Sequence, residues 1–149
     1  MRIIKATKKD FIQIKKLIEE EFPYTKTKME KISDRIKKGN KIFVAKQENN
    51  FLGFVEFKLN KLDANFFGMV VKKESRRKGI GKKLFDFFID FCKKNKISKV
   101  SLIVKKENIK AKNLYKSKGF VKSRELEKKI DGSIIEKMDL NLNEFKGVS

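Results

Sequence analysis

The first part of the chain carries hydrophobic residues with the period of a strand and then with that of a helix. A β-rich run at residues 2–6 comes first. In the stretch 7–21, apolar side chains recur every three or four positions, which predicts an amphipathic helix with Thr7 as its N-cap. We expect Pro23 to end this helix. A second helix is predicted over residues 28–38, before a Gly-Asn pair that favours a helix end.

Three β-rich runs occupy the middle of the chain. The runs 41–47 and 51–59 are separated by Glu-Asn-Asn, which indicates a hairpin between antiparallel neighbours. The run 65–73 is apolar without alternation, as expected of a central strand buried on both faces. A long helix is predicted next, over residues 80–95. Its expected inward side chains are Leu84, Phe85, Phe87, Phe88, Phe91 and Cys92.

The last third of the chain predicts a strand, a short helix and a closing hairpin. The strand spans 99–104 and the helix 107–119, while the hairpin pairs 120–126 with 133–142 around an Asp-Gly-Ser turn. The order β-α-α-β-β-β-α-β-α-β-β predicts an α/β fold with a mixed, mostly antiparallel central sheet and helices on both faces. At least one crossover should join parallel strands. The size of the chain predicts a single domain over residues 1–149.

The composition of the chain limits the kinds of binding and catalysis that we expect. The formal net charge is +20, but only five of the 39 basic residues are arginine, and the lysines lie along the whole chain among Asp and Glu. Because arginine is the better reader of bases and phosphates, this distribution does not favour specific nucleic-acid binding. The chain has no histidine, which excludes Ser-His-Asp and Cys-His catalysis and most zinc sites, so no metal is expected.

The lone cysteine and the absence of long apolar runs suggest where the protein works. Cys92 lies on the apolar side of the predicted helix 80–95, which favours core packing over a role as nucleophile. A single cysteine forms no internal disulfide, which fits a reducing cytoplasm. No signal peptide or membrane-spanning segment is predicted. We therefore expect a cytoplasmic protein without a membrane partner.

A glycine-containing stretch, SRRKGIGKKL at residues 75–84, lies between a predicted strand and the start of a helix. There, free main-chain N–H groups and the positive end of the helix dipole favour an anion, and the two glycines leave room for a phosphate. A simple surface turn is the alternative. The spacing does not fit the P-loop, and position 84 is leucine where a dinucleotide fingerprint needs glycine.

Two motifs carry a resemblance to a known family. The first is R-x-x-G-x-G, from Arg76 to Gly81, and the second is NIKAKNLYKSKGF, from Asn108 to Phe120. Together they resemble the pyrophosphate-binding motif and the later N-x-x-A-x-x-L-Y-x-x-x-G-F segment of the GNAT superfamily, the Gcn5-related N-acetyltransferases. The resemblance covers residues 65–121, and the order of elements is similar over almost the whole chain.

The resemblance implies how acetyl-CoA would bind. The cofactor would lie in a V-shaped gap between the strands at 65–71 and 98–104. Main-chain groups of one strand would pair with the pantetheine arm, main-chain N–H groups of the loop would hold the pyrophosphate, and the asparagine would bind a pantetheine amide or simply cap its helix. The residues implied in cofactor binding are Met69, Val70, Val71, Arg76, Arg77, Lys78, Gly79, Ile80, Gly81, Lys82 and Asn108.

The resemblance also implies a catalytic arrangement. Tyr115 matches the tyrosine that protonates the leaving thiolate; a tyrosine of the core wall is the alternative. Ile103 stands where the ribosomal-protein N-terminal alanine acetyltransferases have a glutamate base, which argues against that branch. Glu56 is our substitute, because its strand alternation places it on an apolar face; a solvated strand-end charge and a water chain remain alternatives.

The implied activity is transfer of an acetyl group from acetyl-CoA to a primary amine by direct attack. The acceptor would be a protein N-terminus, a lysine or a small amine, selected by the first two helices and the loops near residues 24–29 and 128–133. A non-catalytic, basic RNA- or ribosome-binding module on the same fold is the alternative. The oligomeric state, monomer or homodimer, stays open.

Overall fold

The structure is a computed structural model that describes residues 1–21 and 31–143. The order of elements predicted from the sequence is confirmed. Pro23, the loop at 24–29 and the predicted first turn of the second helix lie outside the described residues. The elements are β1 (Arg2–Lys5), α1 (Lys8–Glu21), α2 (Ile32–Lys37), β2 (Lys41–Gln47), β3 (Asn50–Asn60), β4 (Asp63–Val71), the 3-10 turn η1 (Lys73–Ser75), α3 (Ile80–Lys94), β5 (Lys99–Lys105), α4 (Ile109–Ser117), β6 (Val121–Ile130) and β7 (Ser133–Asn141).

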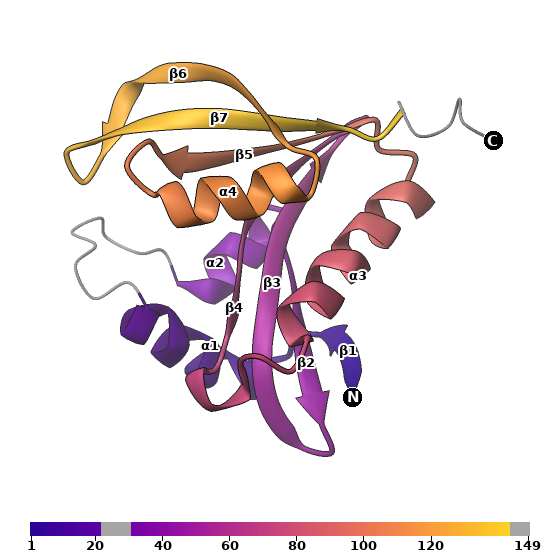
Figure 1. Cartoon of the computed structure of the whole chain (residues 1–149). Helices are drawn as coiled ribbons and strands as arrows, with labels where there is room; N and C mark the ends of the chain where they lie inside the picture. The colour runs from indigo at the N-terminus through magenta and orange to yellow at the C-terminus, as the bar shows by residue number, and fades with distance from the viewer. Residues whose placement is uncertain (22–30, 144–149) are drawn as a thin grey trace.

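The strands form one seven-stranded sheet in the order β1-β2-β3-β4-β5-β7-β6. Within the described residues, β4 and β5 are the parallel pair, joined through α3, and the other neighbours are antiparallel. Figure 1 shows α1 and α2 at one side of strands β2 to β4 and α3 at the other. The predicted mixed, mostly antiparallel sheet with helices on both faces is therefore confirmed.

Helix α1 is fixed at its start by a buried carboxylate. The main-chain N–H of Thr7 donates to Oδ2 of Asp10 at 2.8 Å, an arrangement in which the third helical residue caps the first turn. Asp10 is buried and lies 2.7 Å from Nζ of Lys46 on β2. The same carboxylate thus caps the helix and attaches it to the sheet.

The parallel pairing of β4 with β5 is short. It covers Asp63 to Asn65 opposite Lys99 to Ser101, and then the two strands diverge, as Figure 1 shows. A bulge at Phe67 adds to the bend, because Glu56 pairs with Gly68 while its neighbour pairs with Phe66. The prediction that β4 is buried on both faces is wrong: Asp63, Asn65 and Phe67 are exposed at alternate positions, with Phe67 54% exposed, so one face of this part of the strand is open.

Aromatic packing holds α3 against the sheet. Phe88 is fully buried and its ring centroid lies 4.8 Å from that of Phe57 and 5.0 Å from that of Phe66. The buried residues of α3 are Ile80, Leu84, Phe85, Phe88 and Cys92, and Phe87 and Phe91 pack beside them, as the periodicity predicts. Pairs of this kind add to the area they bury, so the N-terminus of α3 is held firmly beside the end of β4.

Cys92 is fully buried, and burial raises the pKa of its thiol to about 12. The thiol is therefore neutral at pH 8, whereas the unfolded chain would present a thiol with an ordinary pKa near 8.5. We expect Cys92 not to react with Ellman's reagent at pH 8 until denaturant is added, and then to react completely. Stoichiometric reaction of the native protein would contradict this placement.

No helix among the described residues is long and apolar enough to cross a membrane.

Candidate functional site

The loop between β4 and α3 has the backbone of an anion-binding nest. Arg77 and Gly79 have positive φ angles of 64° and 79°, so the chain enters the left-handed region twice around Lys78. Such turns direct successive N–H groups to one point. Nothing lies within 4 Å of the position that a Cβ would take at Gly79, so the space beside this residue is open.

The first turn of α3 adds further donors. The N–H of Lys83 donates to the carbonyl of Gly79 at 3.1 Å and opens the helical ladder. The N–H groups of residues 80–82 precede this bond and have no acceptor within the helix. They lie at the positive end of the helix dipole. Loop and helix together have the backbone geometry expected of a phosphate cradle, and the role that the sequence predicts for residues 77–82 stays a prediction.

The basic side chains of the loop differ in what they contact. Arg77 and Lys78 are exposed, and Nζ of Lys82 lies 3.2 Å from Asp86, where both side chains are exposed. Arg76 is engaged: its Nε donates to the carbonyl of Val71 at 3.0 Å and its guanidinium pairs with Glu21. We therefore assign Arg76 to holding the loop against β4 and α1, rather than to the phosphate as the motif alone suggests.

Arg76→Lys is expected to lower the free energy of unfolding by about 0.5–1 kcal/mol, because lysine has no planar fork with which to reach Val71 and Glu21 together. Arg77→Lys is the matched control, and its effect should stay within about 0.5 kcal/mol, since the described residues give Arg77 no partner. Urea denaturation measures both. Equal effects would contradict the anchoring role.

A cleft of about 530 Å³ opens where β4 and β5 diverge. It brings together five of the predicted site residues, from β3, β4, the start of α4 and α4 itself: Glu56, Met69, Val70, Asn108 and Tyr115. The other lining residues are Ile18, Arg35, Phe54, Phe67, Gly68, Ile103, Val104, Lys105 and Ala111.

The hydrogen-bond ladder decides which main-chain groups of β4 face this cleft. The N–H of Lys72 donates to Leu52 on β3 at 2.8 Å, and groups along an antiparallel strand alternate in direction. Val70 therefore also points to β3, and the prediction that its main chain serves the cofactor is corrected: Val70 contributes its side chain to the cleft. Met69 and Val71 point away from β3, although Arg76 already occupies the Val71 carbonyl.

Tyr115 lies on α4 with its ring against the aromatic core. The ring centroids of Phe66 and Phe120 lie 6.1 Å and 5.8 Å away in edge-on contact. Burial raises the pKa of the Tyr115 phenol, so the hydroxyl keeps its proton at neutral pH. Within residues 1–21 and 31–143 the hydroxyl has no hydrogen-bond partner. The ring is thus part of the core wall, while the hydroxyl is free to donate.

Asn108 is the N-cap of α4, as the alternative interpretation of its motif predicts. Its Oδ1 accepts from the N–H of Ala111 at 3.1 Å. The side-chain amide keeps its two donor hydrogens at the edge of the cleft. Helix capping therefore leaves Asn108 able to donate to a ligand.

Glu56 is buried, with 2% of its surface exposed, so the alternative of a solvated strand-end charge is wrong. Nε of Arg35 donates to Oε2 at 3.0 Å, the second guanidinium nitrogen pairs with Oε1, and Nδ2 of Asn40 donates to Oε2 at 2.8 Å. Sequence reasoning missed both partners. No local pattern marks them, because the pairing joins α2 to β3 across the fold.

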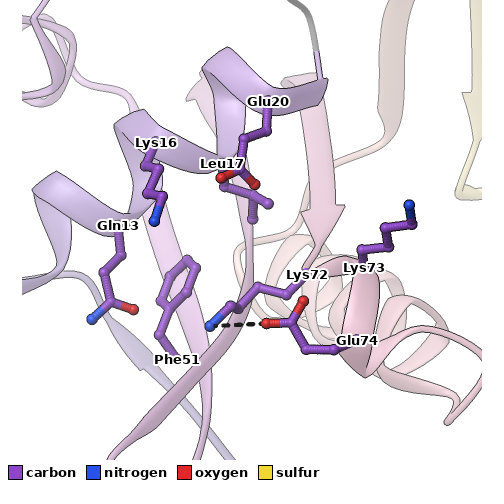
Figure 2. A pocket seen from close by; sticks show the side chains of 8 residues that line it. All are labelled: Gln13, Lys16, Leu17, Glu20, Phe51, Lys72, Lys73 and Glu74. Carbon is purple, nitrogen blue, oxygen red and sulfur yellow. Dashed lines mark ion pairs between the residues drawn. The ribbon is translucent and has the colours of Figure 1, made fainter.

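A second pocket lies between α1 and η1 (Figure 2) and contains none of the predicted site residues. Its charged side chains are mixed in sign, with Lys72 3.4 Å from Glu74 in the ion pair drawn there. Leu17 and Phe51 form its apolar part. Nothing in it converges on a ligand, so we place the candidate site in the cleft between β4 and β5.

Comparison with known families and structures identifies the family and the fold. The family model described as acetyltransferase (GNAT) domain matches residues 5–142. No curated protein sequence matches the chain.

Solved structures share the fold at low sequence identity. Ribosomal-protein-alanine N-acetyltransferase from Brucella melitensis is 17% identical with a TM-score of 0.76, covering 95% of this chain and 100% of that one. Ard1 from Thermoplasma volcanium is 22% identical, with a TM-score of 0.78 and coverage of 94% and 96%. A point mutant of spermidine N-acetyltransferase SpeG from Vibrio cholerae is 21% identical, with a TM-score of 0.78 and coverage of 97% of each chain.

Proposed function

Because the chain belongs to the acetyltransferase (GNAT) family, we propose that it transfers the acetyl group of acetyl-CoA to a primary amine, as a single domain over residues 1–149 in the cytoplasm. The observation that carries this proposal is the shared geometry of the two motifs. Asn108 and Tyr115 line the cleft where β4 and β5 diverge, and so does Met69 on β4. The nest at residues 77–82 lies next to that part of β4, because the Cβ position at Gly81 is 4.0 Å from Cε of Met69 and 3.8 Å from the Val71 side chain.

The chain's own groups fit the parts of acetyl-CoA. Main-chain N–H groups of residues 77–82 would hold the pyrophosphate, supported by the charges of Lys78 and Lys82. The N–H and carbonyl of Met69 and the N–H of Val71 would pair with the pantetheine arm. The amide of Asn108 would bind it from the opposite wall.

When bound, acetyl-CoA supplies the acetyl group as a thioester: the amine nitrogen bonds to the acetyl carbon, the carbon–sulfur bond breaks, the amine loses a proton and the thiolate gains one. Tyr115 would give a proton to sulfur, because its hydroxyl is protonated and unpartnered in the described chain. The proton lost by the nitrogen would pass to water, and a proton from water would restore the Tyr115 hydroxyl. The N–H of Met69 would face the carbonyl oxygen as negative charge develops there.

Glu56 is the one carboxylate among the described residues that line the cleft. We propose that it binds the acceptor amine, directly or through a water. Arg35 and Asn40 occupy three of its roughly four acceptor positions. The remaining position on Oε1 would accept a hydrogen bond from the amine or from a water beside it. Glu56 therefore orients the acceptor more than it removes a proton.

Binding and turnover test the proposal together. Acetyl-CoA at about 100 times its Kd should raise the melting temperature by roughly 5–10 °C, and thiol release should require an added amine. Absence of a shift at saturating acetyl-CoA would contradict the proposal. Retention on RNA by a protein that ignores acetyl-CoA would favour the basic binding module instead.

A further inference from the structure

We infer that the preferred acceptor is the α-amine of a polypeptide whose first side chain is apolar. The inference rests on the proposed function and concerns only which amine enters the cleft. It comes from two independent features of the described cleft walls: the lack of an unpaired base and the apolar, net-positive acceptor side.

No unpaired base faces the acceptor side among the described residues. The titratable groups that line the cleft are Arg35, Glu56, Lys105 and Tyr115, and the chain has no histidine. Both oxygens of Glu56 bind the Arg35 guanidinium in a buried, bidentate ion pair, so neither oxygen is without a partner. Lys105 is a cation 3.6 Å from Asp131. The acceptor must therefore arrive largely neutral.

The fraction of neutral amine at pH 7 separates the acceptor classes. An α-amine with a pKa near 7.8 is about 15% neutral, whereas a lysine amine with a pKa near 10.4 is about 0.04% neutral. The difference is roughly 300-fold and exceeds what one hydrogen bond to Glu56 would recover. Without a base to make up this difference, the α-amine is the better nucleophile at neutral pH.

The walls of the cleft oppose a polyamine and suit an apolar residue. Arg35, Lys105 and Glu56 sum to one positive charge, and the one carboxylate is already paired, so a second ammonium group would meet no partner among the described lining residues. Phe67 and Ile103 are each 54% exposed, and both line this cleft. An apolar side chain next to the amine would cover them.

Three acceptors test the inference at pH 7. They are a lysine-free peptide with a free N-terminus and a leading apolar residue, the same peptide blocked at its N-terminus and given one lysine, and spermidine. We expect kcat/KM for the first to exceed the others at least 100-fold, with mass spectrometry placing the acetyl group on the α-nitrogen. Its kcat/KM should rise tenfold per pH unit and level off at the pKa of the peptide amine.

A variant of the cleft wall gives a readout of specificity. Ile103→Ala should raise KM about tenfold for the peptide with an apolar first residue and leave KM unchanged for a glycine-first peptide, because only the former uses this contact. Equal effects on both would overturn the apolar preference.

The failures are distinguishable. Equal or faster use of lysine or spermidine overturns the inference and leaves the proposed function intact. The inference is also overturned if the pH at which kcat/KM levels off stays fixed when the pKa of the peptide amine is changed. Binding of acetyl-CoA without acetylation of the peptide overturns it as well. Failure to bind acetyl-CoA at all overturns both.

A second inference comes from a buried ion pair under α4. The structure assigns Glu136 on β7 as a positioning residue for the helix that carries Asn108 and Tyr115. Glu136 is 1% exposed, and its oxygens lie 2.9 Å from Nζ of Lys112 on α4 and 3.3 Å from Nζ of Lys122 on β6. Its lysine partners, Lys112 first, hold the pKa of the carboxyl below its usual range, so it stays charged.

Helix α4 has no fully buried residue, and among its described residues Ala111 and Tyr115 pack against the core from partly buried positions. Lys112 lies four positions after Asn108 and three before Tyr115, so all three fall on one side of the helix. Its ammonium also donates to the carbonyl of Lys106 at 3.2 Å. The ion pair with Glu136 therefore sets the position of the asparagine amide and of the phenol relative to the cleft.

Glu136→Gln tests the assignment, because it keeps the shape and removes the charge. We expect kcat to fall about tenfold, KM for acetyl-CoA to rise about fivefold, and amide hydrogen exchange to quicken in α4 but not in α3. Glu74→Gln is the control: Glu74 on η1 pairs with Lys72 at an exposed position, shares no partner with Glu136 and should leave all three readouts unchanged.

A double variant separates positioning from general stability. Glu136→Leu with Lys112→Met replaces the buried pair with apolar packing and should recover most of kcat, as such replacements often preserve structure. A Glu136→Gln protein that is less stable but has unchanged kcat, KM and α4 exchange would overturn the assignment, and so would equal loss of exchange protection throughout the sheet.

Discussion

Gly79→Glu is expected to weaken acetyl-CoA binding at least 100-fold, equivalent to about 2.7 kcal/mol. Two effects add. A glutamate side chain at Gly79 would occupy the open space beside the nest and hinder the pyrophosphate, and its carboxylate would repel the pyrophosphate at the helix N-terminus. Isothermal titration with acetyl-CoA measures the change, and the thermal shift should vanish with it.

The chain contains a matched control for backbone strain. Gly132, in the turn between β6 and β7, has the same φ of 79° and likewise has nothing within 4 Å of its Cβ position. Both glutamate variants should lose about 1–2 kcal/mol of stability, because each places a side chain in the left-handed region. Only the Gly79 variant should lose acetyl-CoA. Equal loss in both would show that strain, not the nest, is responsible.

Tyr115→Phe is expected to lower kcat by about 10²–10³ while acetyl-CoA binding stays within about twofold. The hydroxyl lies beside the cleft and has no hydrogen-bond partner in the described chain, so its loss removes a proton donor without leaving a buried group unpaired. Steady-state kinetics at saturating acetyl-CoA measures the effect.

Tyr115→Phe should have little effect on the stability of the folded state. Phenylalanine preserves the edge-on contacts with Phe66 and Phe120, so the free energy of unfolding should change by less than about 0.5 kcal/mol. Unchanged kcat in Tyr115→Phe would return Tyr115 to the alternative of a core-wall residue and leave proton donation to water.

Local patterns were sufficient for the elements and for the loop. The apolar period of α3 and the turn chemistry at Gly79 and Gly132 depend on neighbours in sequence, so the strand-helix order and the nest could be predicted. The second motif added Asn108 and Tyr115, and the structure places both at the cleft. Their roles stay predictions until the variants are measured.

Features that depend on distant parts of the chain could not be predicted. Phe67 is exposed although the apolar run predicts burial, because packing by distant elements decides which face of β4 is covered. The bulge at Phe67 likewise depends on the register with β3. The direction of the Val70 main chain follows from register with β3. Arg35 reaches Glu56 only once α2 lies over β3, and this contact decides how basic the acceptor side is.

The three structural relatives explain why fold alone does not identify the acceptor. Their names cover a ribosomal protein and spermidine, yet each matches this chain at 17–22% identity with nearly complete coverage. The identity of the acceptor must therefore be inferred from the residues that line the cleft. Here these walls present a paired carboxylate and two exposed apolar side chains, Phe67 and Ile103.

The central claim is that main-chain amides at residues 77–82 bind the pyrophosphate of coenzyme A. Titration of ¹⁵N-labelled protein with coenzyme A, followed by amide chemical shifts, tests it most directly. We predict the largest shifts at residues 77–82, with smaller ones at Met69 and Val71 on the facing strand. Saturation that leaves the amides of 77–82 unmoved while others respond would contradict the account.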